Sequence, residues 1–195
     1  FFNTVVDDSQ RMTNIQDPVS GVAQVVKNAG DIEYRGFEID GVYTITDTVT
    51  MVASLGYVHS KYKNLISDLT GDFIIDALDY ALEVPRAAPL TYSLGFNIDG
   101  NLGTWRSITR ISYYHRDKSY YNENNQGFIN EQDILNFGYD IYSSDGKINI
   151  GIYGKNLSNE VKHGGDTNLS FGGTFAPLAK GKIVGAELVY KFWTK

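Results

Sequence analysis

Apolar and polar residues alternate along most of the chain, and the stretch 182–193 shows this pattern without a break. One set of alternate positions is apolar or aromatic: Val184, Ala186, Leu188, Tyr190 and Phe192. The other set includes the charged residues Glu187 and Lys191. Successive side chains of a strand point to opposite faces. The pattern therefore predicts a β-strand with one apolar face and one face that carries charge.

The same alternation predicts about eight strands in all. They cover residues 1–12, 24–46, 48–63, 86–99, 104–118, 132–143, 147–157 and 182–193, with a bulge at 28–30. Short turns at 47, 100–103 and 144–146 alternate with long connections at 14–22, 64–84, 119–130 and 158–181; the second includes a short helix within 73–82. This hairpin rhythm predicts an all-β, antiparallel up-and-down barrel, with both chain ends at the end that carries the short turns.

Periodicity alone does not decide whether the apolar face points inward, as in a soluble barrel, or outward, as in a membrane barrel. An ordinary antiparallel sheet with a solvated charged face has the same pattern. Two features favour a transmembrane barrel. Aromatic residues occur near strand ends, as in an interfacial girdle. The polar face also carries charges of both signs, which suit cross-strand pairs around a wet lumen: Glu38, Asp40, Arg106, Arg110, Asp140, Lys155, Glu187 and Lys191.

Composition excludes several classes of function. The net charge of −6 argues against a nucleic-acid partner, which requires a basic surface. The absence of cysteine excludes disulfides and thiolate metal sites. The sequence has no apolar run long enough for a transmembrane helix, but a spanning strand needs only about 9–11 residues. The 14 tyrosines suit both strands and interfacial girdles.

Several short motifs, in their order and spacing, resemble the late barrel of TonB-dependent outer-membrane receptors. They are Asp7-Asp8-Ser9-Gln10-Arg11, Asn28-Ala29-Gly30, Gly36-Phe37-Glu38, Ala53-Ser54-Leu55-Gly56-Tyr57, Ala87-Ala88-Pro89 and Gly154-Lys155-Asn156-Leu157. The closing strand, with Tyr190 and Phe192, is similar to the aromatic strand that ends this family. The family usually ends on the aromatic residue itself, whereas here Trp193 and two further residues follow.

The resemblance implies that residues 1–195 are the C-terminal part of a barrel of about 22 strands, without its plug domain. It also implies the outer membrane of a Gram-negative bacterium and energy-coupled uptake of a scarce ligand: an iron chelate such as a siderophore, cobalamin or an oligosaccharide. The implied partners are outer-membrane lipid, TonB through a segment outside this sequence, and the barrel-insertion machinery, which would recognise Tyr190, Phe192 and Trp193.

Two other functions compete with this one. A self-contained eight-stranded outer-membrane barrel with a structural or adhesive role has the same patterning. An outer-membrane enzyme is less well supported, because His59, His115 and His163 have no accompanying nucleophile motif. The glycine pairs in 158–181 lack the Lys-Ser/Thr context of a phosphate loop. No catalytic residue and no cofactor is therefore predicted.

Ligand-binding residues are expected in the long connections, because a rigid scaffold usually presents its binding groups on loops. The candidates are Asp68, Asp72, Asp76, Asp79, Tyr120, Tyr121, Asn122, Asn124 and Asn125. Rings and amides suit stacking on, and hydrogen bonding to, a sugar or an aromatic chelate. The four aspartates lack the dense ligand spacing of a calcium loop, so no metal site is predicted. The alternative is that these loops are solvated and pack only on one another.

Overall fold

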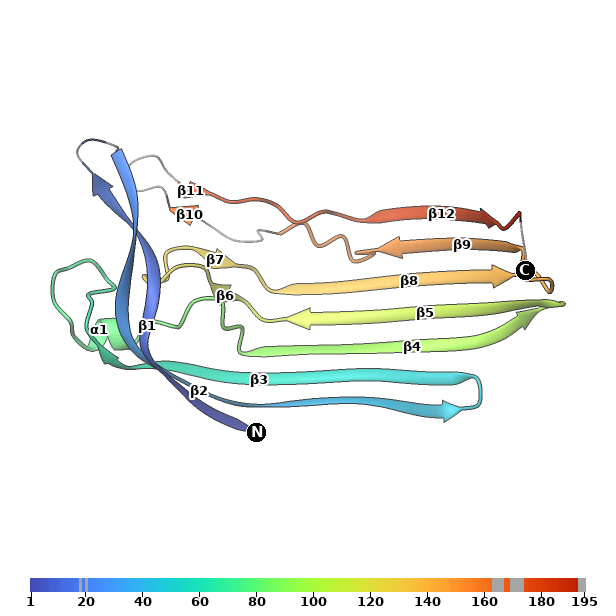
Figure 1. The fold of residues 1–195 in the computed structure, drawn as a ribbon, viewed down its shortest axis with the longest axis horizontal. Coiled ribbons are helices and arrows are strands. Elements are labelled where there is room, and N and C mark those ends of the chain that lie inside the picture. The colour runs from blue at the N-terminus through green and yellow to red at the C-terminus, as the bar shows by residue number, and fades with distance from the viewer. Residues whose placement is uncertain (18, 20, 163–166, 169–173, 193–195) are drawn as a thin grey trace.

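The chain forms one large antiparallel sheet, shown in Figure 1. The computed structural model describes residues 1–17, 19, 21–162, 167–168 and 174–192. The eight strands of the sheet, in spatial order, are β1 (Phe2–Asp17), β2 (Gly21–Thr46), β3 (Val49–Leu65), β4 (Leu90–Leu102), β5 (Trp105–Arg116), β8 (Gln132–Tyr142), β9 (Ile148–Lys155) and β12 (Ile183–Tyr190). Each strand pairs with its neighbour along the chain, which confirms the predicted up-and-down β architecture.

The loops contain the remaining elements. Helix α1 (Ala77–Tyr80) lies within the predicted helical segment. Two small hairpins complete the fold: β6 (Ser119–Tyr120) with β7 (Phe128–Ile129), and β10 (Thr167–Asn168) with β11 (Thr174–Phe175). In the described part of the chain, no helix has the length and apolar character needed to cross a membrane.

The two ends of the sheet differ. Strands are joined by tight turns at one end and by the long connections 66–89, 117–131 and 156–182 at the other (Figure 1). Strand β12 ends at the short-turn end, where Tyr190 pairs with Ile148, as predicted. The predicted position of the N-terminus is wrong. Phe2 pairs with Gly36, which lies well inside β2 and not at the short-turn end.

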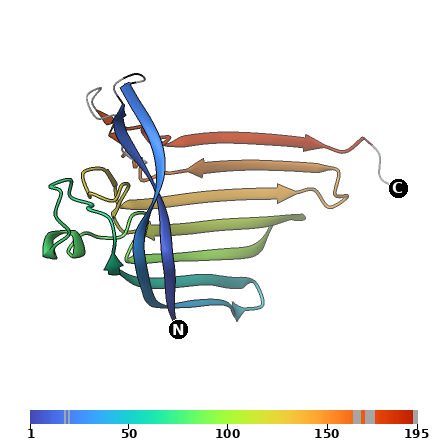
Figure 2. The same cartoon turned by 60° about the vertical axis from the view of Figure 1, so that its left-hand side comes forward.

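The hairpin of β1 and β2 is longer than predicted. The expected connection 14–22 is wrong, since Gln16 pairs with Val22 and Asp17 with Gly21. The outer part of this hairpin bends across the ends of the other strands (Figure 2). There its backbone ladder is completed within the hairpin, so strand formation does not require an alternating sequence. The expected bulge is confirmed by register shifts around Ser9 and by Gly30, whose φ is 128°.

The two faces of the sheet match the predicted division. A row on the apolar face runs across Ala53, Leu94, Tyr113 and Leu135. Large side chains on this face are uncovered; Leu188, for example, is 70% exposed.

The polar face has a ladder of polar contacts instead. Arg106 is 2.5 Å from Asp99, Ser54 Oγ is 2.7 Å from Ser93 Oγ, and Arg110 pairs with Asp140. The two ion pairs agree with the expected pairing of opposite charges at Arg106 and at Arg110.

Candidate ligand-binding site

Loop 66–89 is anchored to the polar face of the sheet by a small hydrophobic core. Val84 is buried against Ile32 and Tyr62, which pair across β2 and β3, and against Leu65 at the end of β3. Ile32 belongs to the same set of alternate positions as Glu38, so this core lies on the polar side of the sheet. The loop is therefore folded over the loop end of that face.

The four predicted aspartates bind the backbone of their own loop. Asp79 is fully buried, and its carboxylate accepts hydrogen bonds from the backbone N–H groups of Leu69, Thr70 and Asp76 at 2.7, 2.9 and 3.0 Å. Burial alone would raise the pKa of Asp79, but these three donors hold the pKa below its usual range. The ionised carboxylate thus stabilises the loop.

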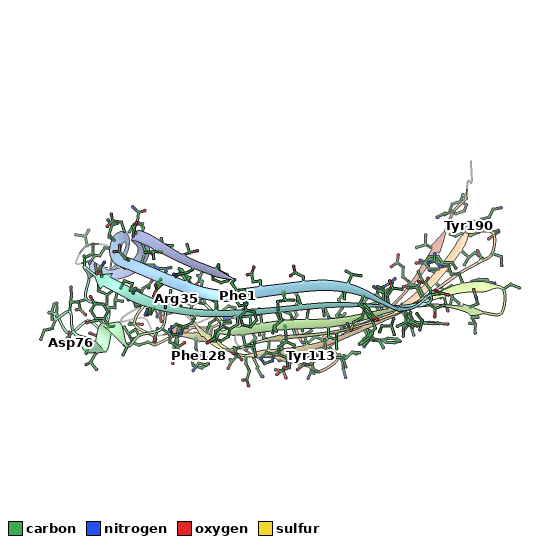
Figure 3. The ribbon with its side chains drawn as sticks, turned by 90° about the horizontal axis from the view of Figure 1, so that it is seen from below. Phe1, Arg35, Asp76, Tyr113, Phe128 and Tyr190 are labelled. Atoms are coloured by element: carbon green, nitrogen blue, oxygen red, sulfur yellow. The ribbon has the colours of Figure 1, made fainter. Side chains whose placement is uncertain are left out.

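The other three aspartates have similar local roles. Asp68 accepts from the N–H groups of Gly71 and Phe73, Asp72 from that of Ile74, and Asp76 caps α1 by accepting from Leu78. The backbone hydrogen bond from Gly71 is the largest contribution that lowers the pKa of Asp68. Figure 3 places Asp76 far along the loop end of the molecule, and Tyr190 at the opposite end.

The predicted amides of loop 117–131 also shape their own loop. Asn122 Oδ1 accepts from the N–H group of Gly127 at 2.9 Å, and Asn124 Oδ1 accepts from that of Gln126 at 3.2 Å. Asn125 is different, because its amide reaches the neighbouring loop. It accepts from the N–H group of Glu83 at 2.8 Å and donates to the carbonyl of Glu83 at 2.9 Å.

A second contact joins the two loops beside Asn125. The N–H group of Arg86 donates to the carbonyl of Tyr120 at 2.7 Å, and the Arg86 guanidinium lies 4.7 Å from the centre of the Tyr121 ring. The ring of Tyr120 instead faces the ammonium of Lys118 at 5.0 Å. Loops 66–89 and 117–131 therefore form one continuous structure across the end of the sheet.

A cavity of about 550 Å³ lies where these loops meet the polar face of the sheet. Its volume is in the range of small-molecule sites. The polar face of the sheet contributes Glu38, Thr91 and Arg116 to the lining of this cavity, and the loops contribute Arg86 and Tyr121. Arg116 is oriented by Ser119, to which it donates at 2.9 Å. A lining with two arginines, one glutamate and one tyrosine suits a ligand with anionic and aromatic groups.

The cavity includes only one of the predicted ligand-binding residues, Tyr121. The other eight build or join the loops around it, and their role in binding stays a prediction. Sequence reasoning did not select Arg86 or Arg116. Arg116 ends β5 and belongs to the same set of alternate positions as Arg106 and Arg110, so the alternation could have placed it on the polar face. Arg86 has no periodic signal, because a turn at Pro85-Arg86 places it; for the same reason the strand predicted from residue 86 begins only at Leu90.

The closing strand forms an edge of the sheet. β12 pairs with β9, and the rings of Tyr190 and Phe192 pack edge to face with centroids 4.9 Å apart. Both rings are exposed. The third predicted residue of the assembly signal, Trp193, lies outside the described residues.

No cluster of three or more His, Cys, Asp or Glu side chains suited to a metal ion occurs among residues with a described position. His115 contacts two carboxylates, those of Asp133 at 2.7 Å and Asp117 at 3.1 Å, on the side of the sheet opposite the cavity.

Comparison with known proteins gives matches at the level of structure. No protein-family model and no curated protein matches the sequence. The ferric yersiniabactin uptake receptor FyuA from Yersinia pestis superposes with a TM-score of 0.75 at 16% identity, over 98% of this chain and 26% of the receptor. The fold is that of part of a receptor barrel.

Two receptors from Acinetobacter baumannii agree. The ferric preacinetobactin receptor BauA has a TM-score of 0.65 at 13% identity, and the siderophore receptor PiuA has 0.64 at 18%. Each match covers 93% of this chain, and 26% and 25% of those receptors, respectively. The chain thus spans about a quarter of the length of the solved structures it matches. All three are described as receptors for iron-siderophore complexes or siderophores.

Proposed function

We propose that this chain is part of the barrel wall of a TonB-dependent outer-membrane receptor that takes up an anionic iron chelate. The cavity at the loop end of the polar face carries this proposal, because it brings Arg86, Arg116 and Tyr121 together above the interior of a receptor-type barrel. Of the three ligand classes expected from the sequence, the two guanidiniums favour an iron chelate with carboxylate, phenolate or catecholate groups.

The proposal extends to residues 1–195 as the C-terminal part of a larger barrel whose plug domain lies outside this sequence. The open sheet supports this extension, since β1 and β12 are the edges of the described sheet and pair with one neighbour each. A barrel that closed with these strands alone would pair β1 with β12. The self-contained eight-stranded barrel is therefore the weaker alternative.

The membrane setting is part of the same proposal. The uncovered apolar face would contact outer-membrane lipid, and the ladder of charged and hydroxyl groups would line the lumen. TonB would supply the energy through a segment outside this sequence. The barrel-insertion machinery would read the aromatic end of β12.

Uptake by the intact protein that carries this chain tests the proposal. The intact protein would be expressed in a strain without other iron-chelate receptors, and the growth of this strain would be measured on a panel of ferric siderophores, cobalamin and oligosaccharides. We expect Arg86→Ala with Arg116→Ala to abolish growth on one ferric chelate. The matched control is Arg106→Ala, an arginine of the same face at the short-turn end. Unchanged uptake of the transported ligand by the double variant would rule out this cavity as the site.

A further inference from the structure

Three cations converge on one carboxylate on the apolar side of the sheet, near the loop end. Glu33 is almost fully buried, and its carboxylate lies 2.6 Å from Arg35, 3.3 Å from Lys61 and 3.4 Å from Lys63. We call Arg35, Lys61 and Lys63 the outer cation cluster. One negative charge offsets only one of its three positive charges, so the group keeps a net charge of about two in a chain of net charge −6.

The cationic groups have room for a further partner. The side chains of Arg35, Lys61 and Lys63 are 55%, 42% and 41% exposed, whereas that of Glu33 is 5% exposed. Glu33 thus holds the three cations together from beneath, while N–H donors remain available on the outer side. This arrangement is a preformed site for an anion with several oxygens.

The position of the cluster indicates where that anion comes from. Arg35 lies two residues from Phe37 along β2, which is about 7 Å along a strand. The Phe37 ring packs against Phe1 and Tyr57 with centroids 5.9 and 5.8 Å apart. Ring clusters of this kind on the apolar face of a barrel mark the level of the lipid headgroups. The cation cluster follows directly beyond these rings toward the loops.

We propose that the outer cation cluster binds a phosphate group of a lipid in the outer leaflet of the outer membrane. This inference rests on the proposed membrane function. Arginine and lysine side chains beside a membrane-facing surface attract anionic headgroups, and Arg35 adds a planar fork that matches phosphate oxygens. The site would fix a lipid against β2 and β3, on the opposite side of the sheet from the ligand cavity.

Lipid retention tests the proposal on the intact protein in phosphatidylcholine vesicles. The vesicles would contain bisphosphorylated lipid A, the same lipid without phosphates, or neither, and the lipid retained after transfer to detergent would be counted by native mass spectrometry. Lys61→Ala with Lys63→Ala should lower retention of phosphorylated lipid A by about tenfold or more. The control pair Lys147→Ala with Lys191→Ala, at the short-turn end, should leave retention unchanged.

Further measurements distinguish lipid phosphate from free phosphate as the ligand and test the role of Glu33. Free inorganic phosphate at the same concentration should not displace the lipid, and added salt should weaken retention by the unmodified protein. Glu33→Gln keeps all three cations and an oxygen acceptor at their centre, and it removes the negative charge that opposes a phosphate, so this variant should retain at least as much lipid. Equal retention of phosphorylated and dephosphorylated lipid, displacement by free phosphate, or unchanged retention in the lysine variant would overturn the proposal.

The uptake test and the lipid test have independent outcomes. The lysine variant should remain folded by heat-modifiability and should still take up the ligand, because its changes lie opposite the cavity. If Lys61→Ala with Lys63→Ala does not assemble, the salt dependence and the dephosphorylated lipid still decide the matter with the unmodified protein. Loss of uptake in the Arg86 and Arg116 variant with normal lipid retention would confirm that the two sites are distinct.

Discussion

The two ends of the sheet are stabilised in different ways. The buried apolar residues lie at the loop end, either on β2, β3 and β7 or in loop 66–89: Ala29, Ile32, Tyr62, Leu65, Val84 and Ile129. Toward the short turns, the described residues form regular ladders in which large apolar side chains stay exposed. The loop end therefore packs around a core of its own, whereas the rest of the sheet, which we call the wall, leaves its large apolar side chains uncovered.

Substitution in the wall should have the largest effect. Leu94→Arg places a charge in the middle of the apolar face, at a cost of about 2–4 kcal/mol near the midplane of a membrane. Ser93→Arg places the same charge on the polar face. We expect Leu94→Arg to reduce the folded, heat-modifiable protein in the outer membrane far more than Ser93→Arg. If both variants assemble equally, lipid does not cover that face.

The loop end should respond to loss of its buried carboxylate. Asp79→Ala leaves three backbone donors without their acceptor, at a cost of about 1–3 kcal/mol for each buried group left unsatisfied. Hydrogen exchange should then quicken at Leu69 and Thr70 while the wall strands stay protected. Asp72→Ala is the control, because Asp72 accepts one backbone bond in an exposed setting. Loss of protection throughout the barrel would show that the two ends are not independent.

The same carboxylates give the loop a pH dependence. Hydrogen bonds hold the pKa values of Asp68 and Asp79 below the usual value of 3.8, so their ionised forms stabilise the folded loop. This contribution is complete above pH 3.8 and is lost as the pH falls through the lowered pKa values. Acid should therefore release loop 66–89 before the wall, as measured by protease cleavage in that loop. Release of the loop and the wall at the same pH would contradict the expected difference in their acid stability.

The short-turn end should be sensitive at its last aromatic residues during assembly. Phe192→Ala with Trp193→Ala removes the proposed signal for the insertion machinery and the edge-to-face contact with Tyr190. We expect less folded protein in the outer membrane, with normal ligand uptake per folded molecule. A normal level of heat-modifiable barrel in this double variant would exclude the signal.

The smallest effect is expected where the two loops join. Asn125 has a φ of 56°, so Asn125→Gly removes the amide but keeps a residue that adopts this backbone conformation. Loss of two exposed hydrogen bonds to Glu83 should weaken ligand binding by only a few-fold, since exposed bonds contribute near the lower end of the usual range, about 0.5 kcal/mol each. Asn124→Ala, which removes a bond within one loop, should bind ligand normally. If Asn125→Gly and Asn124→Ala bind the ligand with equal affinity, the contact between the two loops does not shape the cavity.

The wall was predictable from sequence because its geometry is local. Alternation alone placed Leu94 and Ser93 on opposite faces and located the tight turns. The loop end was not predictable in the same way. Arg86 and Tyr121 meet only through contacts between segments about 35 residues apart, and Asp79 looked like a solvated carboxylate until its backbone partners were placed. The outer part of the first hairpin was also missed, because strands that project past the sheet need no alternating faces.

Arg86 shows what the cavity demands of the backbone. At the tight turns, glycine adopts a positive φ without steric cost, as Gly103 does at 62° and Gly146 at 67°. Arg86 adopts nearly the same angle, 61°, although its side chain makes this conformation less favourable by about 1–2 kcal/mol. Stability alone would favour glycine after Pro85. Selection for a more heat-resistant protein would thus tend to replace Arg86 with glycine, and the stabilised protein would lose a guanidinium at the mouth of its barrel.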